Sequence, residues 1–201
     1  NKMKINVKIF GDGANIEDMV NLSQNGIVDG LTTNPTLMAR AGITDYLDFA
    51  RQVLELIKTT PVSFEVFSDD LEEMYKQAKI LSELGENVYV KIPVTNTKSA
   101  STASIVKRLS DEGVNLNVTA IFTKDQIKEV YDALNETTPS IVSIFAGRIA
   151  NAGIDPEPIM QFFPITTLLS IILFEPITEF LPIFTFLPIK TLFPNLTDLY
   201  L

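Results

Sequence analysis

Lys91 lies in a stretch whose other residues are almost entirely apolar. It interrupts the run Val-Tyr-Val-Lys-Ile-Pro-Val at 88–94, a pattern typical of a buried strand that ends at its proline. Burial disfavours the charged form of a lysine, and imine formation with a carbonyl compound requires the free amine. The ordinary alternative is a lysine whose head group reaches solvent from the strand end. Its place at the carboxyl end of a strand favours a Schiff-base lysine, because barrel active sites gather at that end.

Polar residues also occur at or near the ends of five other expected strands. Singly, each has an ordinary explanation: Asp12 fits a turn, Thr-Thr-Asn-Pro at 32–35 fits a helix entry, and Arg148 fits a surface cation. Together they place polar groups at one end of six consecutive strands, which is hard to obtain by chance and is typical of an active site. Besides Lys91, the set comprises Asp12, Thr33, Asn34, Glu65, Asn117, Thr119, Ser143 and Arg148.

The composition excludes several kinds of chemistry. The 201 residues contain no cysteine and no histidine, so a disulfide framework, a zinc site of the usual ligands and a Ser-His or Cys-His pair are impossible. The net charge of −9 argues against nucleic acid or an anionic membrane as a partner. A phosphorylated metabolite stays open, because one local cation can hold a phosphate. Catalysis must use Lys, Asp, Glu, Thr, Ser or Tyr.

Strand and helix patterns alternate through the first 160 residues. Six such units predict an α/β fold with parallel strands, either a barrel or a doubly wound sheet. A (β/α)8 barrel takes about 250 residues, so this chain of 201 is slightly short and still lacks two recognisable strands. Strands are expected at 5–10, 27–32, 62–67, 87–92, 114–119 and 140–145. Helices are expected at 15–25, 35–58, 70–84, 98–111 and 123–135, with N-terminal caps at 68–70 and a capping box at 123–126.

The tail at 161–201 has a different composition. It holds five prolines spaced by multiples of six, and no glycine follows residue 153. The prolines argue against one helix and against central strands. The tail is therefore interpreted either as a frameshifted end or as a genuine apolar segment that packs on the barrel or on a neighbour. A membrane-spanning role is least favoured, because the longest uncharged run, 158–174, has 17 residues with a proline inside, while a spanning helix needs about 20.

Four motifs carry a resemblance to a known family. They are Thr-Thr-Asn-Pro-Thr at 32–36, Val-Lys-Ile-Pro-Val-Thr at 90–95, Asn-Val-Thr at 117–119 and Phe-Ala-Gly-Arg-Ile at 145–149. At these spacings they resemble the transaldolases, especially the short ones, whose relatives include the fructose-6-phosphate aldolases. The resemblance covers residues 3 to 160 and implies a (β/α)8 TIM barrel, with a transaldolase-like barrel domain at 1–160. After residue 160 nothing matches the family's seventh and eighth strands, including the serine and arginine that complete phosphate binding there.

The resemblance implies a class I mechanism without cofactor or metal. Lys91 would form an iminium at C2 of a phosphorylated ketose, and Asp12 would take the proton of the C4 hydroxyl as the C3–C4 bond breaks. Glu65 and Thr119 would hold the water that carries protons during imine formation and hydrolysis.

It also implies a set of substrate-binding residues. Asn34 and Asn117 would bond the dihydroxyacetone unit, Ser143 would orient the substrate, and Arg148 would hold its phosphate. The implied binding residues are Thr33, Asn34, Asn117, Ser143, Phe145 and Arg148.

Two positions separate transfer from simple cleavage. Fructose-6-phosphate aldolases carry Gln and Tyr where this chain has Glu65 and Phe145, and both residues here are the transaldolase choice. The expected reaction is transfer of a dihydroxyacetone unit between phosphorylated ketoses and aldoses, a step of the pentose phosphate pathway. Cleavage that releases free dihydroxyacetone is the alternative. An inactive barrel fragment with an interaction-prone or aggregation-prone tail is the non-enzymatic alternative.

Location and assembly can also be predicted. No basic-then-apolar signal region precedes the first expected strand, so a cytoplasmic protein is expected. Family members often assemble through the C-terminal helix, and a homo-oligomer is expected here on that resemblance, although that helix is not recognisable in this sequence.

Overall fold

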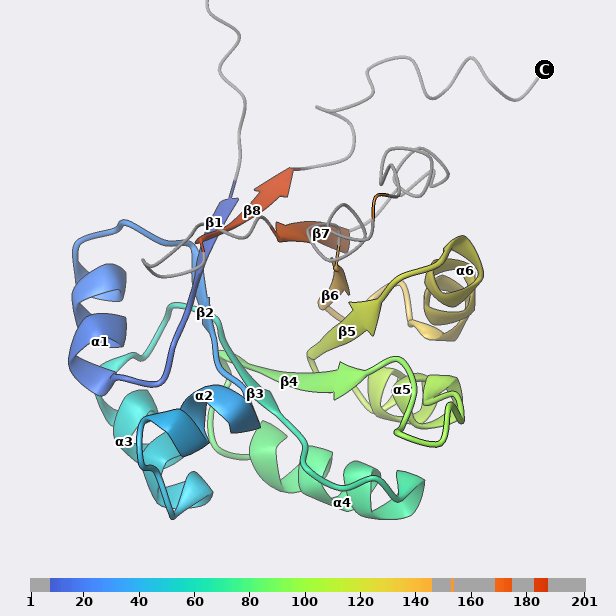
Figure 1. Cartoon of the computed structure of the whole chain (residues 1–201), viewed down its shortest axis with the longest axis horizontal. Coiled ribbons are helices and arrows are strands. Elements are labelled where there is room, and N and C mark those ends of the chain that lie inside the picture. The colour runs from blue at the N-terminus through green and yellow to red at the C-terminus, as the bar shows by residue number, and fades with distance from the viewer. Residues whose placement is uncertain (1–7, 146–152, 154–168, 175–182, 188–201) are drawn as a thin grey trace, which may run out of the picture.

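The computed structural model describes residues 8–145, 153, 169–174 and 183–187. Helices and strands alternate along these residues as the sequence predicts (Figure 1). The strands are β1 Lys8–Asp12, β2 Gly30–Thr32, β3 Val62–Glu65, β4 Val88–Pro93, β5 Leu116–Ile121, β6 Ser140–Ile144, β7 Leu169–Phe174 and β8 Ile183–Leu187. The helices are α1 Ile16–Gln24, α2 Pro35–Arg40, α3 Tyr46–Leu56, α4 Leu71–Ser82, α5 Ala103–Asp111 and α6 Lys124–Ala133.

The strands form a closed barrel in the order β1 to β8. Every neighbouring pair from β1 to β7 is parallel. Figure 1 shows helices α1 to α6 outside the arc of strands β1 to β6. This arrangement confirms the predicted α/β barrel architecture and excludes the doubly wound sheet.

The last two strands differ from the first six. β7 pairs in parallel with β6, whereas β8 runs antiparallel to both β7 and β1. A regular (β/α)8 barrel has eight parallel strands, so β8 is a departure. The prolines of the tail do not interrupt these strands: Pro176 and Pro182 fall between β7 and β8, and Pro188 follows β8. Strands therefore form in the stretches between prolines, where the sequence pattern argued against central strands.

The local chemistry of the chain sets the helix boundaries. Asn15, Asn34, Asp45 and Asp70 accept a backbone hydrogen bond with their side chains at helix starts, which satisfies a donor that the helix itself leaves free. Thr123 forms the predicted capping box with Gln126 at the start of α6.

Two helix predictions need correction. The single helix expected at 35–58 is two helices, because Gly42 takes a left-handed conformation after α2 (φ +75°) and Asp45 caps a new start. The helix expected at 98–111 begins only at Ala103. The preceding residues form a turn in which the Asn96 N–H donates to the Ala100 carbonyl and Ser99 has φ +62°.

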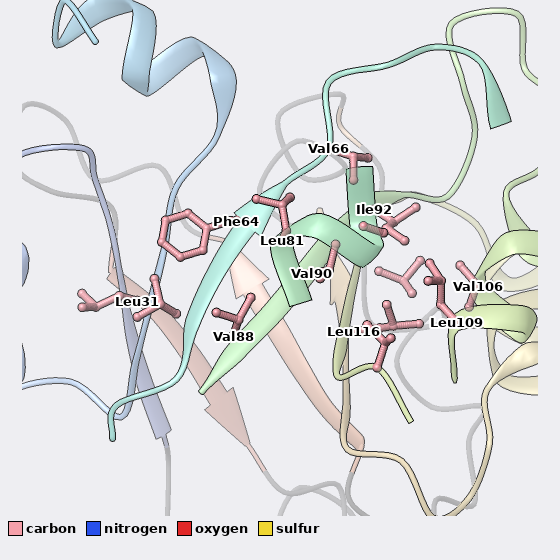
Figure 2. Close-up of a cluster of buried hydrophobic side chains, with 14 of the residues drawn as sticks. Leu31, Phe64, Val66, Leu81, Val88, Val90, Ile92, Val106, Leu109 and Leu116 are labelled. Carbon is pink, nitrogen blue, oxygen red and sulfur yellow. The ribbon is translucent and has the colours of Figure 1, made fainter. Parts of the chain in front are cut away.

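The apolar core lies between the strands and the helices that cover them. Figure 2 shows Ile92 and Leu116 from the sheet close to Val106 and Leu109 of α5, and all four side chains are buried. Helix α4 contributes Leu81 in the same way. Since successive strand residues point to opposite faces, the residues between these apolar ones point into the barrel.

One close approach inside the barrel depends on glycine. A Cβ atom at Gly30 in β2 would lie 2.0 Å from the ring of Phe10 in β1. Phe10 is itself buried, so a side chain at position 30 would have to displace it.

No helix in the described ranges is long and apolar enough to cross a membrane.

Candidate active site

Lys91 and Glu65 form an ion pair inside the barrel. They are register partners on β4 and β3, and Lys91 Nζ lies 3.3 Å from Glu65 Oε2. The Lys91 side chain is 8% exposed and that of Glu65 is 19% exposed, so the amine is enclosed while the carboxylate retains some access to solvent. A carboxylate at this distance can exchange a proton with the amine or with a water beside it. The expected enclosed lysine is therefore present.

Asp12 ends β1, two strands before β3 in the barrel order. Its Oδ1 accepts a hydrogen bond of 2.7 Å from the Thr32 hydroxyl on the neighbouring strand β2. Burial raises the pKa of Asp12, and the charge of Lys91 and the bond from Thr32 oppose that rise. A carboxylate with a raised pKa that also interacts electrostatically with the amine is suited to take and return a proton.

Asn117 connects three strands by its side chain. It lies opposite Lys91 in the β4–β5 register, its Nδ2 donates to Ser63 Oγ on β3 at 3.0 Å, and its Oδ1 accepts from Ser143 Oγ on β6 at 2.6 Å. All three residues are buried. The two bonds fix which end of the amide faces which strand, and the second N–H of Nδ2 can donate to a ligand. Ser143 thus acts on Asn117 in addition to its predicted role in orienting the substrate.

Two predicted threonines carry buried hydroxyls. Thr33 is 0% exposed and Thr119 is 2% exposed, and neither hydroxyl makes a hydrogen bond to the described residues. A buried hydroxyl without a partner is costly, and that of Thr119, which points the same way as Asn117, is suited to bind a water or a substrate oxygen. Thr33 follows Thr32 and so points to the opposite face, and its role toward the substrate stays a prediction. Thr119 lies opposite Pro93, two residues beyond Lys91, in the β4–β5 register, which suits its predicted role toward the water.

The remaining predicted binding residues are placed unequally. Asn34 uses its Oδ1 to cap α2 through the Leu37 N–H, and its NH2 group is the part that can donate to a substrate. Phe145 follows β6, and its ring packs edge-on against Phe122 with centroids 5.4 Å apart. Arg148, the predicted phosphate anchor, lies outside the described residues.

Sequence reasoning missed the residues that hold the predicted ones in place. Thr32 bonds Asp12, Ser63 bonds Asn117, and the Tyr46 hydroxyl donates to the main-chain oxygen of Glu65 at 2.6 Å. Alternation gave a signal for Ser63, because it lies two residues before Glu65 and so points the same way. Tyr46 gave no such signal, since it belongs to a helix start.

Within the described ranges, no group of three or more carboxylates gathers as metal ligands would. The described polar groups around Lys91 are its amine, the carboxylates of Asp12 and Glu65, and neighbouring amides and hydroxyls, which suit proton transfer and carbonyl chemistry.

Fold and site together define an α/β-barrel protein with its polar groups at the carboxyl ends of the strands, where barrel enzymes hold their active sites. Residues 9–162 match the family model described as transaldolase/fructose-6-phosphate aldolase. The chain belongs to this family of aldolase and transaldolase enzymes, as the motifs around Lys91 predicted.

Individual relatives agree with this placement. A probable transaldolase of Dehalococcoides mccartyi is 40% identical over 149 residues, which cover 74% of this chain and 65% of the relative. A probable transaldolase of Methanococcus vannielii is 38% identical over 161 residues, covering 78% of this chain and 70% of the relative. One of Aquifex aeolicus is 39% identical over 143 residues, covering 71% and 61%. The chain thus spans about two thirds of the length of these relatives.

Proposed function

We propose that the protein is a transaldolase that moves a dihydroxyacetone unit between sugar phosphates through an imine at Lys91. The observation that carries the proposal is the enclosed Lys91 side chain, which is 8% exposed and holds its amine 3.3 Å from Glu65 Oε2. An amine held in this way can condense with a ketone, while the carboxylate handles the protons of the condensation. Membership of the family and the relatives described as probable transaldolases support the same reaction.

The first half of the reaction divides the work among four residues. Lys91 Nζ attacks C2 of the ketose phosphate, and water leaves to give an iminium, with Glu65 and Thr119 holding the water and moving its protons. Asp12 takes the proton of the C4 hydroxyl. The electrons of the C3–C4 bond then pass into the iminium, which becomes an enamine, and the aldose phosphate departs.

The second half reverses these steps on another aldehyde. C3 of the enamine attacks the carbonyl carbon of the acceptor, Asp12 returns its proton to the new C4 oxygen, and water releases the new ketose from Lys91. Asn34, Asn117 and Ser143 would hold the hydroxyls of the three-carbon unit throughout. Arg148 and Thr33 would complete substrate binding, with Arg148 at the phosphate.

Transfer is favoured over cleavage by two residues. Glu65 carries a carboxylate beside the amine, and Phe145 presents a ring without a hydroxyl, packed against Phe122. A ring without a hydroxyl gives no proton to the enamine, so the enamine persists until an acceptor aldehyde arrives. The reaction so defined is the transaldolase step of the pentose phosphate pathway.

The test is a transfer assay with one control for simple cleavage. With sedoheptulose 7-phosphate and glyceraldehyde 3-phosphate together, the protein should produce fructose 6-phosphate and a four-carbon aldose phosphate. Fructose 6-phosphate alone should release little free dihydroxyacetone. Rapid release of dihydroxyacetone without an acceptor would replace the proposal by the aldolase reaction, and no turnover in either assay would refute both.

A further inference from the structure

The hydroxyl of Tyr46 reaches the strand end that carries Glu65. Tyr46 is the first residue of α3, and its hydroxyl donates to the main-chain oxygen of Glu65 at 2.6 Å. Glu65 is the last residue of β3 and the register partner of Lys91. The bond therefore joins a helix on the outside of the barrel to the residue whose carboxylate contacts the amine within it.

A gap in the strand ladder explains why this bond exists. Between β2 and β3, the Leu31 N–H donates to Pro61 O at 2.8 Å and the Thr33 N–H to Ser63 O at 3.1 Å. The next bond in this series would run from residue 35 to Glu65 O, but β2 ends at Thr32, and residue 35 is the proline that begins α2 and has no N–H. The Tyr46 hydroxyl supplies the donor that Pro35 lacks, so the Glu65 carbonyl is satisfied by a side chain.

The ring of Tyr46 packs against two phenylalanines, one that precedes Glu65 in the sequence and one that follows it. It packs edge-on against Phe64 with centroids 6.2 Å apart and against Phe67 with centroids 4.3 Å apart. Burial raises the pKa of Tyr46 far above its ordinary value, so the hydroxyl remains protonated and a donor at any working pH. The ring contacts thus fix the direction of the Tyr46 hydroxyl, and the raised pKa keeps it protonated.

We infer that Tyr46 is a positioning residue: its hydrogen bond to the Glu65 carbonyl fixes the end of β3 and so places the Glu65 carboxylate against the Lys91 amine. The inference deepens the proposed function and rests on it, because Glu65 is assigned there to proton transfer during imine formation and hydrolysis. Tyr46 acts through Glu65 and not on the substrate.

This role confines the effect of Tyr46 to the steps that use Glu65. Imine formation and imine hydrolysis need the carboxylate beside the amine, whereas C3–C4 cleavage uses Asp12 on β1. Loss of the Tyr46 hydroxyl should therefore slow imine formation and leave substrate binding, measured as KM, nearly unchanged.

The substitution Tyr46→Phe removes only the hydroxyl and keeps the ring contacts. Imine formation at Lys91 is followed by mixing the full-length protein with dihydroxyacetone, quenching with borohydride at set times and measuring the adduct by peptide mass. We expect the rate to fall about 5- to 10-fold, the effect of one lost hydrogen bond. Tyr75→Phe is the matched control, because the Tyr75 hydroxyl bonds Glu112 on the surface, and its imine rate should equal that of the wild type.

A double-mutant cycle separates positioning from general destabilisation. In a Glu65→Gln background, Tyr46→Phe should cause no further slowing, because the carboxylate that Tyr46 positions is already absent. Equal slowing by Tyr46→Phe in both backgrounds would contradict the inference, as would an unchanged rate in the Tyr46→Phe protein.

A crystal structure of the Tyr46→Phe protein keeps this test independent of the proposed function. We expect the contact between Lys91 Nζ and Glu65 Oε2, 3.3 Å in the wild type, to lengthen or break. An unchanged contact overturns the role of Tyr46 even if the protein is an active transaldolase. A contact that breaks in the Tyr46→Phe protein, together with a wild-type protein that forms no imine, supports the positioning and refutes only the transaldolase assignment.

Discussion

The two faces of strand β5 are equally buried and chemically opposite. Leu116 and Val118 are 0% exposed and point toward the helices, while Asn117 and Thr119, at 0% and 2% exposed, point into the barrel. The same contrast appears on β4, where Val90 and Ile92 flank Lys91. Burying a polar group costs free energy that pairing at best offsets, so a row of polar side chains on one face indicates a site and not a core. The comparison teaches that burial alone does not separate core from site, whereas the face of the strand does.

The largest effect is expected from Lys91→Met, which removes the amine and keeps an apolar stem of similar length. The rate of transfer, as kcat/KM, should fall by about 1,000-fold or more, because no other residue can replace the nucleophile. Circular dichroism should show that the variant still folds. Lys128→Met is the control: Lys128 is exposed and paired with Asp132 on the surface of α6, so its loss should leave the rate unchanged.

Adjacent residues on β5 sharpen the comparison of faces. Leu116→Ala should lower the free energy of unfolding by about 2 to 5 kcal/mol, the cost of a cavity between the sheet and the helices, without changing kcat/KM of the folded protein. Asn117→Ala should instead reduce kcat/KM by about 10- to 100-fold, with a smaller loss of stability. Urea unfolding and steady-state kinetics on both variants measure the contrast, and identical behaviour of the two would remove it.

The substitution Asp12→Asn tests whether a residue of the candidate site lowers the stability of the folded protein. Because burial raises its pKa, the charged form is disfavoured in the folded protein, and this penalty is present above the raised pKa and disappears below about pH 4, the ordinary aspartate value. Asp12→Asn should therefore be as stable as the wild type or more stable at pH 7, and should lose that advantage in acid. Its rate should fall about 100-fold or more, since the base is gone.

The pH profile of the wild type gives a second measurement of the same group. Activity should decline with acid as Asp12 is protonated, at a pH above the ordinary aspartate value. A decline centred below that value, or an Asp12→Asn protein that is clearly less stable at pH 7, would contradict the account of Asp12.

The smallest effect is expected at Asp69, whose pKa shifts the opposite way. Its carboxylate accepts hydrogen bonds from the Thr97 backbone N–H and hydroxyl, and these bonds hold the pKa of Asp69 below its ordinary value. The stabilisation is present above about pH 4 and is lost as the pH falls through the lowered pKa. Asp69→Asn should lower the melting temperature slightly at pH 7 and leave it unchanged near pH 2, as measured by calorimetry.

The architecture could be predicted from local patterns, and so could the clustering of Lys91 and Glu65 at the centre of the candidate site. The apolar run around Lys91 and the alternation of strand and helix signals each depend on neighbouring residues alone. The direction of strand pairing does not depend on neighbouring residues alone. An apolar run reads the same in either chain direction, so nothing in residues 183–187 indicated that β8 runs antiparallel. The split of the helix expected at 35–58 was hidden because apolar residues continue across Gly42 and the turn that follows it.

The supporting contacts were harder to predict than the reactive groups. Glu65 and Lys91 stand out as charges in apolar strands, but Tyr46 lies 19 residues before Glu65 and bonds its main chain. Such a bond depends on how α3 packs beside β3, which no local pattern specifies.

Covalent trapping tests the central claim most directly. The protein is incubated with fructose 6-phosphate, reduced with borohydride and digested, and the peptide that contains Lys91 is weighed. The account predicts a three-carbon adduct on Lys91, absent without sugar and absent from Lys91→Met. An unmodified Lys91, or an adduct carried only by other lysines, would contradict it.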